Sequence, residues 1–469
     1  MRTRTARITR RGFPRIICLV AALYLASAAT AQQQTDVLIG FSKLDITPAH
    51  PVMLHGYGSR SAEATEADHP IFVRVMALRS PAPGSSPLVW AAIENCAVTA
   101  EFTESVRRAI AESHPALTAE RFTLSVTHTH SAPMLTHTIG AIFGRPLTDD
   151  HAANVERYTR FLAERIETAT LAAMENLEPA ALSWATGSAP FAISRRVITD
   201  GRWSGWGAIT DAPADHTLPL LVAKDSVGET IGLVASYPCH CTTVGGDYNK
   251  VFGDWAGTAS QLLEADHAGL TAMVVIGAGA DSNPYPRNSY EQAVRHGHTI
   301  ANEINRLLQT QLTPLRGTPI PSLTHAPLPL DVYSKEKLTE MLTANNGGFA
   351  YYAQTQLDIL ERDGVLRDHV SLPVAVWAWP DQLAIVSLGG EVVAEYALKL
   401  YEQHPGGKLW VNAYTNDVPC YIPSQRIIRE GGYEYDTNMH FYQQPGVFNP
   451  AVEPTLLKVI NDALPEALR

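Results

Sequence analysis

Short apolar runs that end in polar loops recur along this chain. In residues 122–127, Phe122, Leu124 and Val126 alternate with polar side chains, which predicts a strand with a buried face. Two apolar stretches between residues 218 and 237 flank the turn signal of residues 225–228, which predicts a hairpin. Further strands are predicted at residues 88–93, 271–276, 383–388 and 409–414.

Helical periodicity appears between several of these strands. It predicts helices over residues 101–113 and 151–177, the second behind Thr148, Asp149 and Asp150, and a shorter helix from Glu391 to about residue 402. Alternating strands and helices predict an α/β fold, with a mixed sheet core, helices packed on it and the site at the C-terminal ends of strands.

Two stretches interrupt the alternation. Residues 187–214 are rich in Gly, Trp and Arg and are predicted to form a loop over a site. The proline-rich residues 314–329 are predicted to be a connector, and they are the candidate for an internal boundary within the mature domain, residues 32–469.

The N-terminus has the pattern of a secretory signal. Six arginines precede the apolar residues 16–26, which are too few to span a membrane, and the small residues 29–31 supply a cleavage site. Residues 1–31 are therefore predicted to be a signal peptide, so that the protein is exported to the periplasm or secreted. Residues 9–13 fit a twin-arginine signal and an ordinary basic n-region equally well.

Composition narrows the class of partner. Hydrophobic residues make up 45% of the chain and charged residues 18%, as in a soluble globular protein. Removing six arginines and no acids takes the formal charge from −11 to −17. Nucleic acid is therefore excluded as a partner recognised by charge, whereas contact with a membrane surface and the oligomeric state stay open.

Four cysteines remain in the predicted mature chain: Cys96, Cys239, Cys241 and Cys420. An oxidising compartment would permit disulfides, although Cys239 and Cys241 are too close in sequence to bridge each other comfortably. A Cys239-His240-Cys241 metal trio is an alternative.

Candidate ligands follow the predicted strands. His128 and His130 come directly after residues 122–127, and neutral imidazole is the commonest nitrogen ligand of zinc, although two exposed loop histidines would look the same. His240 follows the second strand of the predicted hairpin, where a core histidine is the alternative. Glu391 is expected at a helix N-terminus, where the dipole favours an ionised carboxylate. Ser282 ends a glycine-rich loop, which also fits a plain turn.

The motifs together resemble, in order, the catalytic domain of the neutral/alkaline non-lysosomal ceramidases, which are zinc-dependent amidases. They are Gly40-Phe41-Ser42-Lys43-Leu44-Asp45-Ile46-Thr47-Pro48, Leu54-His55-Gly56-Tyr57, Thr127-His128-Thr129-His130-Ser131-Ala132-Pro133, Cys239-His240-Cys241-Thr242, Gly279-Ala280-Asp281-Ser282-Asn283-Pro284, Leu388-Gly389-Gly390-Glu391, Tyr421-Ile422-Pro423-Ser424 and Tyr433-Glu434. The family's C-terminal β-sandwich domain is not expected in this chain, which ends at Arg469.

The resemblance implies a set of site residues. The ligands of one zinc ion per chain would be His128, His240, Glu391 and Tyr421. The catalytic residues would be His130 for proton transfer, Arg195 for substrate binding with Arg196 as its rival, Tyr433 for polarising the scissile carbonyl, and Ser282. Zinc-bound water would then attack the amide bond of ceramide or a related N-acyl lipid.

Two alternatives have the same export signal. One is a zinc amidase or esterase acting on a polar substrate such as an acylated sugar, with Trp203, Trp206 and Arg202 as a platform. The other is a non-catalytic exported binding protein with a degenerate site. The absence of Gly-x-Ser-x-Gly and His-Glu-x-x-His motifs argues against serine hydrolases and zincins.

Overall fold

The computed structural model describes residues 1–3, 36–139, 141–344 and 347–469. The predicted signal peptide therefore lies outside the described residues except for its first three. None of the helices in the described part of the chain is both long enough and apolar enough to span a membrane.

A large mixed sheet forms one half of the core. Its strands are, in spatial order, β10 (Thr271–Ile276), β9 (Thr230–Tyr237), β8 (Thr217–Asp225), β5 (Glu178–Ser188), β1 (Val37–Asp45), β2 (Phe72–Arg79), β3 (Leu88–Ile93) and β4 (Phe122–Val126), with β12 (Thr313–Leu315) paired to β5 beside this path. The pairs β10–β9 and β3–β4 at the two ends are parallel, and the pairs between them are antiparallel.

A second sheet packs face to face on the first. Its strands are, in spatial order, β17 (Leu409–Asn412), β15 (Leu383–Leu388), β14 (His369–Trp379), β13 (Ile320–Val332) and β19 (Gly446–Phe448). The interface contains a tryptophan cluster in which the Trp90 ring of β3 lies 5.8 Å from Trp377 and 6.0 Å from Trp410. Large rings of this kind bury much apolar area, so they hold the two sheets together.

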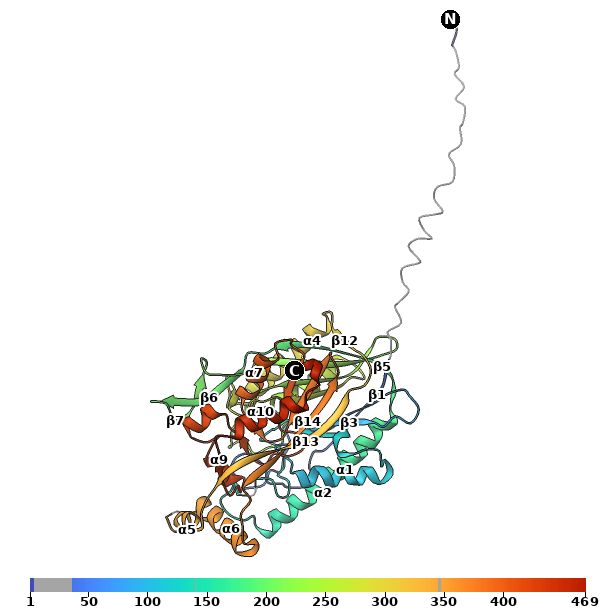
Figure 1. The fold of residues 1–469 in the computed structure, drawn as a ribbon. Helices are drawn as coiled ribbons and strands as arrows, with labels where there is room; N and C mark the ends of the chain where they lie inside the picture. The colour runs from blue at the N-terminus through green and yellow to red at the C-terminus, as the bar shows by residue number, and fades with distance from the viewer. Residues whose placement is uncertain (4–35, 140, 345–346) are drawn as a thin grey trace.

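Helices cover the outer faces of both sheets, which makes four layers (Figure 1). On the large sheet, α2 (Asp149–Glu175) packs on β1 and β2 and beside α1 (Ala100–Ser113), α3 (Asp254–Asp266) packs on β10, and α4 (Tyr290–Leu308) packs on α3 and β5. On the second sheet, α10 (Val452–Ala463) packs on β13, and α7 (Ala394–Gln403) contacts β17. The remaining helices are η1 (Ala119–Arg121), α5 (Lys335–Ala344), α6 (Gly348–Asp363), α8 (Gln425–Glu430), α9 (Thr437–Phe441) and η2 (Glu466–Leu468).

The alternation of side chains along β1 shows how one strand serves two layers. Ile39 points into the cluster between the sheets, whereas Gly40 and Ser42 face α2. The Ser42 hydroxyl donates to the backbone oxygen of Ala169 at 2.6 Å, and a Cβ on Gly40 would lie 2.1 Å from the backbone oxygen of Ala173. The helix therefore lies too close to the strand for any side chain at position 40.

A short segment, residues 413–416, connects the two ends of the large sheet by hydrogen bonds. Strands β4 and β10 are opposite ends of the sheet, yet residues 413–416 hydrogen-bond to both. Ala413 N donates to Ile276 O of β10 at 3.1 Å, and Asn416 N donates to Leu124 O of β4 at 2.8 Å. The loops that follow β4 and β9 also pair, through a parallel bridge between Thr129 and Cys241. The C-terminal ends of these strands are therefore brought together.

Most of the predicted elements are present. The strands at residues 88–93, 122–127, 271–276 and 383–388 and the hairpin at 218–237 are confirmed, while the strand predicted over residues 409–414 ends at Asn412. The two long helices are α1 and α2, and the Thr148 side chain caps α2 by accepting from His151 N at 3.3 Å. The predicted α/β fold with a mixed sheet is thus confirmed.

The prediction of a loop over residues 187–214 was wrong. These residues contain β6 (Ala192–Thr199) and β7 (Arg202–Ile209), an antiparallel hairpin that extends into a three-stranded sheet through β11 (Ser282–Pro284). The hairpin projects at the left of the molecule in Figure 1. No residue of β7 is fully buried and its sequence does not alternate between apolar and polar residues, so the composition carried no strand signal.

The proline-rich residues 314–329 are also not a connector, because they form β12 and most of β13. Proline is tolerated here because residues 320–329 of β13 pair with β14 on one side only. Pro329 O accepts from Asn449 N on the other side, so the nitrogens of Pro321, Pro327 and Pro329, which share that direction, face away from β14. A domain boundary in this region stays a prediction.

Candidate metal centre and pocket

Four side chains from different elements converge where the strands end. His128 follows β4, His240 follows β9, and Glu391 and Tyr421 lie side by side in the short parallel pair β16 (Glu391–Val392) and β18 (Tyr421–Ile422). Glu391 Oε2 lies 3.1 Å from His128 Nε2 and 3.2 Å from His240 Nε2, and the Tyr421 hydroxyl lies 3.1 Å from His240 Nε2. All four side chains are buried.

Backbone carbonyls set the orientation of both imidazoles. His128 Nδ1 donates to Cys96 O at 2.7 Å, and His240 Nδ1 donates to Gly279 O at 3.3 Å. A carbonyl oxygen only accepts, so Nδ1 of each ring carries a proton and Nε2 is the nitrogen that faces Glu391. A hydrogen bond from the far ring nitrogen to a backbone carbonyl is typical of metal-ligating histidines.

The donor set fits a cation. Two Nε2 lone pairs and a carboxylate would repel one another at these distances unless a positive charge, either a proton or a metal ion, lay among them. Burial lowers the pKa of His128, but Glu391 and the Cys96 thiolate outweigh it and raise the value to about 10. A positive charge is therefore stabilised at this point, and nitrogen and oxygen donors of this kind suit zinc.

The charge of Glu391 comes from a different source than predicted. Glu391 was expected at a helix N-terminus, but α7 begins three residues later, at Ala394, and Glu391 lies in β16. Burial raises its pKa, yet His128 and His240 hold the value well below the ordinary one. The Tyr442 hydroxyl also donates to Oε1. Side-chain partners, not the helix dipole, therefore stabilise the carboxylate.

The His128 backbone is strained in the way that functional sites often are. Its φ of 54° lies in the left-handed region, which residues other than glycine seldom adopt. The ring lies 4.4 Å from that of Tyr414, whose own φ is also 54°. The sharp turn after β4 therefore directs the imidazole inward.

His130 lies beside the four donors. Its Nε2 is 3.1 Å from His128 Nε2, and burial, followed by the neighbouring imidazoles of His128 and His240, lowers its pKa well below the ordinary value, so the ring is neutral. Arg60 donates to His130 O at 2.6 Å. A Cβ on Gly56 would lie 2.3 Å from the ring, and Gly56 has a φ of 88°, so only glycine leaves room there.

The two adjacent arginines have different surroundings. Arg195 donates to the Tyr421 hydroxyl at 3.1 Å and places Nη1 3.3 Å from His240 Nε2, and its Nε donates to Glu434 at 2.8 Å. Arg196 points away and pairs with Glu434 and Glu430. Arg195 is therefore the one whose guanidinium reaches the centre. Burial, followed by Arg195, lowers the pKa of His240 to about 3, which keeps that imidazole neutral.

Of Tyr433 and Ser282, Tyr433 lines the pocket and Ser282 does not. The Tyr433 ring lies 5.3 Å from that of Tyr421 and lines the pocket above it. Ser282 is buried behind His240, where its backbone oxygen accepts from His240 N at 3.1 Å, and it does not line the pocket. Its hydroxyl has no hydrogen-bond partner among the described residues.

The four cysteines are buried and unbridged. The metal trio considered for Cys239, His240 and Cys241 was wrong. In the described ranges, the groups with suitable geometry are His128-His240-Glu391 and Cys96-His128-His130. Cys239 and Cys241 belong to the hydrophobic core, where burial raises the pKa of both thiols well above the ordinary value.

Several contacts of the centre carried no sequence signal. Tyr442, Tyr414 and Asn283 were not predicted, although Tyr442 donates to Glu391 and Asn283 Oδ1 accepts from Arg195 at 3.3 Å. Tyr442 is 51 residues from Glu391 in the chain, so no local pattern links the two. Asn283 directly follows Ser282 in the glycine-rich motif, and that proximity is the one hint in the sequence.

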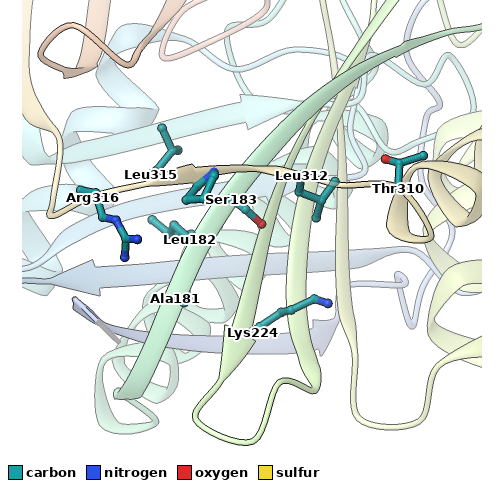
Figure 2. Close-up of a pocket in the computed structure, with 9 residues that line it drawn as sticks. Ala181, Leu182, Ser183, Lys224, Thr310, Leu312, Leu315 and Arg316 are labelled. Atoms are coloured by element: carbon teal, nitrogen blue, oxygen red, sulfur yellow. The ribbon is translucent and has the colours of Figure 1, made fainter. Parts of the chain in front are cut away.

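A pocket of about 570 Å³ opens over this centre. Its lining residues are Gly56, Tyr57, Gly58, His130, Ile142, Arg195, Trp206, Thr242, Gly245, Gly246, Asn283, Arg287, Asn288, Tyr421, Tyr433 and Phe441. Trp206 of β7 stands at the rim with 51% of its surface exposed, and its ring lies 4.7 Å from the Arg195 guanidinium. A smaller hollow of about 250 Å³ near β5 and β12 includes Ser183, Lys224 and Arg316 but none of the candidate site residues (Figure 2).

A buried cluster of two histidines, a glutamate and a tyrosine beneath a pocket, at the strand ends of an α/β fold, is typical of metal-dependent hydrolases. Residues 37–284 match the family model described as neutral/alkaline non-lysosomal ceramidase, N-terminal. The chain therefore belongs to this family, which confirms the resemblance seen in the sequence and indicates a hydrolase.

Solved structures share the fold. The neutral ceramidase from Pseudomonas aeruginosa superposes with a TM-score of 0.69 at 16% identity, covering 92% of this chain and 74% of that one. A ceramidase complexed with C2 superposes with the same score and identity, covering 92% of this chain and 75% of that one. No curated protein matches the sequence.

Proposed function

We propose that this protein is a zinc-dependent hydrolase that cleaves the amide bond of an N-acyl lipid such as ceramide, releasing a fatty acid and an amine. The observation that carries the proposal is the convergence of His128, His240, Glu391 and Tyr421 beneath a pocket lined by Arg195. Membership of the ceramidase family supports the same reaction class.

The four donors would hold the ion between them. A zinc ion supplies a Lewis acid that polarises an amide carbonyl and acidifies water near neutral pH. His130 is neutral and its Nε2 lies beside the centre, so it takes a proton from the attacking water there. The same atom returns this proton to the nitrogen of the leaving amine, which completes the hydrolysis with no net gain or loss of protons on the ring.

Arg195 and Tyr433 act on the carbonyl oxygen. Arg195 is held by Glu434, and its remaining donors point at the centre. Burial raises the pKa of the Tyr433 phenol, so Tyr433 keeps its proton and can donate it in a hydrogen bond. Two fixed donors facing the oxygen stabilise the negative charge that develops as water adds.

Tyr433→Phe tests this assignment. We expect kcat on a fluorescent N-acyl-sphingosine to fall by about 10²- to 10³-fold, because one oxyanion donor is lost, while zinc content stays unchanged. Tyr435→Phe is the matched control, since Tyr435 is a partly buried neighbour that does not line the pocket. Equal rates for wild type and Tyr433→Phe would remove Tyr433 from the mechanism. A zinc-loaded wild type that leaves N-acyl-sphingosine intact would refute ceramide as substrate.

The polar-substrate alternative rests on a single side chain. Of the three residues predicted to form a platform, Trp206 lines the pocket, Trp203 packs against it at 5.6 Å, and Arg202 donates to Arg429 O instead. The exposed indole of Trp206 could stack on a sugar ring as well as on an acyl chain. An acylated sugar is therefore the second substrate to assay.

We also propose that the protein is exported, on the pattern of residues 1–31 alone. The small residues 29–31 then predict cleavage before Gln32. Mass spectrometry of protein recovered from the periplasm or medium should give a chain that starts at Gln32. Recovery of the intact chain from the cytoplasm would contradict export.

A further inference from the structure

The charges that line the pocket are unbalanced. Two of its lining residues, Arg195 and Arg287, are cations, and none is an aspartate or glutamate. Arg195 is neutralised by Glu434, with Nε 2.8 Å from Oε1. Arg287 forms no ion pair with any residue that the structure describes. As far as the structure describes the chain, the pocket therefore contains one cation without a counter-charge.

Most of the donors of Arg287 are also unused. A guanidinium has five N–H groups, and Arg287 makes one hydrogen bond to the described residues, from Nη2 to the Tyr57 hydroxyl at 3.3 Å. Its Nε is shielded from solvent and has no partner in the described part of the chain. Polar groups shielded from solvent are ordinarily satisfied, so the free Nε calls for an acceptor.

A neighbouring acid does not supply this acceptor. Asp254 is buried nearby, where it contributes with Arg287 to the electrostatics of Tyr57 and Cys239. Its two carboxylate oxygens accept instead from backbone nitrogens, among them Thr243 at 2.9 Å and Trp255 at 2.7 Å. Both carboxylate oxygens of Asp254 are therefore used by backbone amides, and no ion pair between Asp254 and Arg287 is found among the described residues.

Tyr57 connects Arg287 to the reacting centre. Its ring lies 5.0 Å from that of His130, edge to face, while its hydroxyl accepts from Arg287. The pocket wall also contains the apolar side chains of Trp206, Ile142 and Phe441. If the substrate amide lies at the centre, its acyl chain can pack on this apolar wall. The substituent on the amide nitrogen can then reach the Arg287 cation.

We propose that Arg287 binds an anionic group of the substrate, and that the preferred substrate class is an N-acyl compound whose amine part carries a carboxylate, such as an N-acyl amino acid. Arginine pairs with a carboxylate through two parallel hydrogen bonds, which would use the free Nε together with a terminal nitrogen. The proposal rests on the proposed hydrolase, since it names the substrate of the same pocket.

Two nearly isosteric ligands test it. N-dodecanoylglycine ends in a carboxylate, whereas N-dodecanoylglycinamide ends in a neutral amide. The binding of each ligand to the zinc-supplemented protein can be measured by isothermal titration calorimetry. We expect the carboxylate to bind at least about tenfold more tightly, because hydrogen bonds to charged groups are worth about that factor or more. Arg287→Gln should erase the preference, and Arg287→Lys should keep part of it. Arg295→Gln, an exposed arginine of α4 outside the pocket, should keep all of it.

The outcomes separate this proposal from the proposed function. Equal affinities for the two ligands in wild type, or a preference that survives Arg287→Gln, would overturn the role of Arg287. If Arg287→Gln still prefers the carboxylate ligand, the carboxylate binds the metal instead of Arg287. If both ligands are hydrolysed without discrimination, the hydrolase stands and the anion site fails. If the carboxylate is preferred through Arg287 but neither amide is cleaved, the anion site stands and the hydrolase fails.

Discussion

His240→Ala is expected to release the zinc ion and to lower kcat/KM on N-acyl-sphingosine by about 10³-fold or more. His240 Nε2 contacts both Glu391 and Tyr421. Its loss therefore removes one of the four donors and also the side chain that both of these donors contact. A catalytic metal is worth several kcal/mol of transition-state stabilisation, which corresponds to at least about three orders of magnitude in rate.

The measurement is zinc per chain by mass spectrometry of the purified protein, taken beside the rate. Circular dichroism should show that His240→Ala keeps the fold, since the strands do not depend on the imidazole. His298→Ala, on the exposed face of α4, should keep both zinc and rate. A wild type without zinc would refute the ligand set and favour the binding-protein alternative. Zinc present without ceramide cleavage would leave the centre intact and refute the substrate.

Arg195→Gln is expected to lower kcat by about 10²- to 10³-fold while zinc stays bound. Arg195 donates to the Tyr421 hydroxyl and faces the place where the oxyanion would form, and one such donor is worth about this factor. The fold should survive, because Glu434 keeps its pairing with Arg196. Single-turnover kinetics and zinc content together would distinguish a lost donor from a lost metal.

The neighbouring Arg196 provides the matched contrast. Arg196 is buried and pairs with Glu434 and Glu430, away from the centre. Arg196→Gln should therefore lower the free energy of unfolding by about 3–5 kcal/mol, the usual cost of breaking a buried ion pair, and should change kcat much less than Arg195→Gln. If Arg196→Gln loses as much kcat as Arg195→Gln at equal folding, or if Arg195→Gln loses its zinc, the division of roles is wrong.

The motif residues were accessible to sequence reasoning because each follows a locally encoded strand. The alternation of residues 122–127 predicted β4, and His128 follows it directly. The same holds for His240 after β9 and for Glu391 after β15. Family resemblance then linked these separate strand ends into one ligand set, which no spacing in the chain could have done.

Local patterns failed where the structure depends on distant partners. Residues 187–214 and 314–329 contain glycines and prolines that read as loops, yet they are strands because β6 pairs with β7 and β11, and β13 pairs with β14. Glu391 looked like a helix start because its short strand exists only through pairing with Tyr421, thirty residues later. Pairing of this range leaves no periodic trace in a single segment.

By itself, the sequence determined the strands, the long helices and the order of the candidate ligands, because those features depend on hydrogen bonds and burial within a few residues. The tertiary structure alone decided that β4 and β10, at opposite ends of the large sheet, meet through residues 413–416 and so bring His128 to His240. It also decided that Arg195 rather than Arg196 reaches the centre, and that Arg287 has no counter-charge among the described residues. Such facts depend on how remote segments close around one another, which local propensity does not encode.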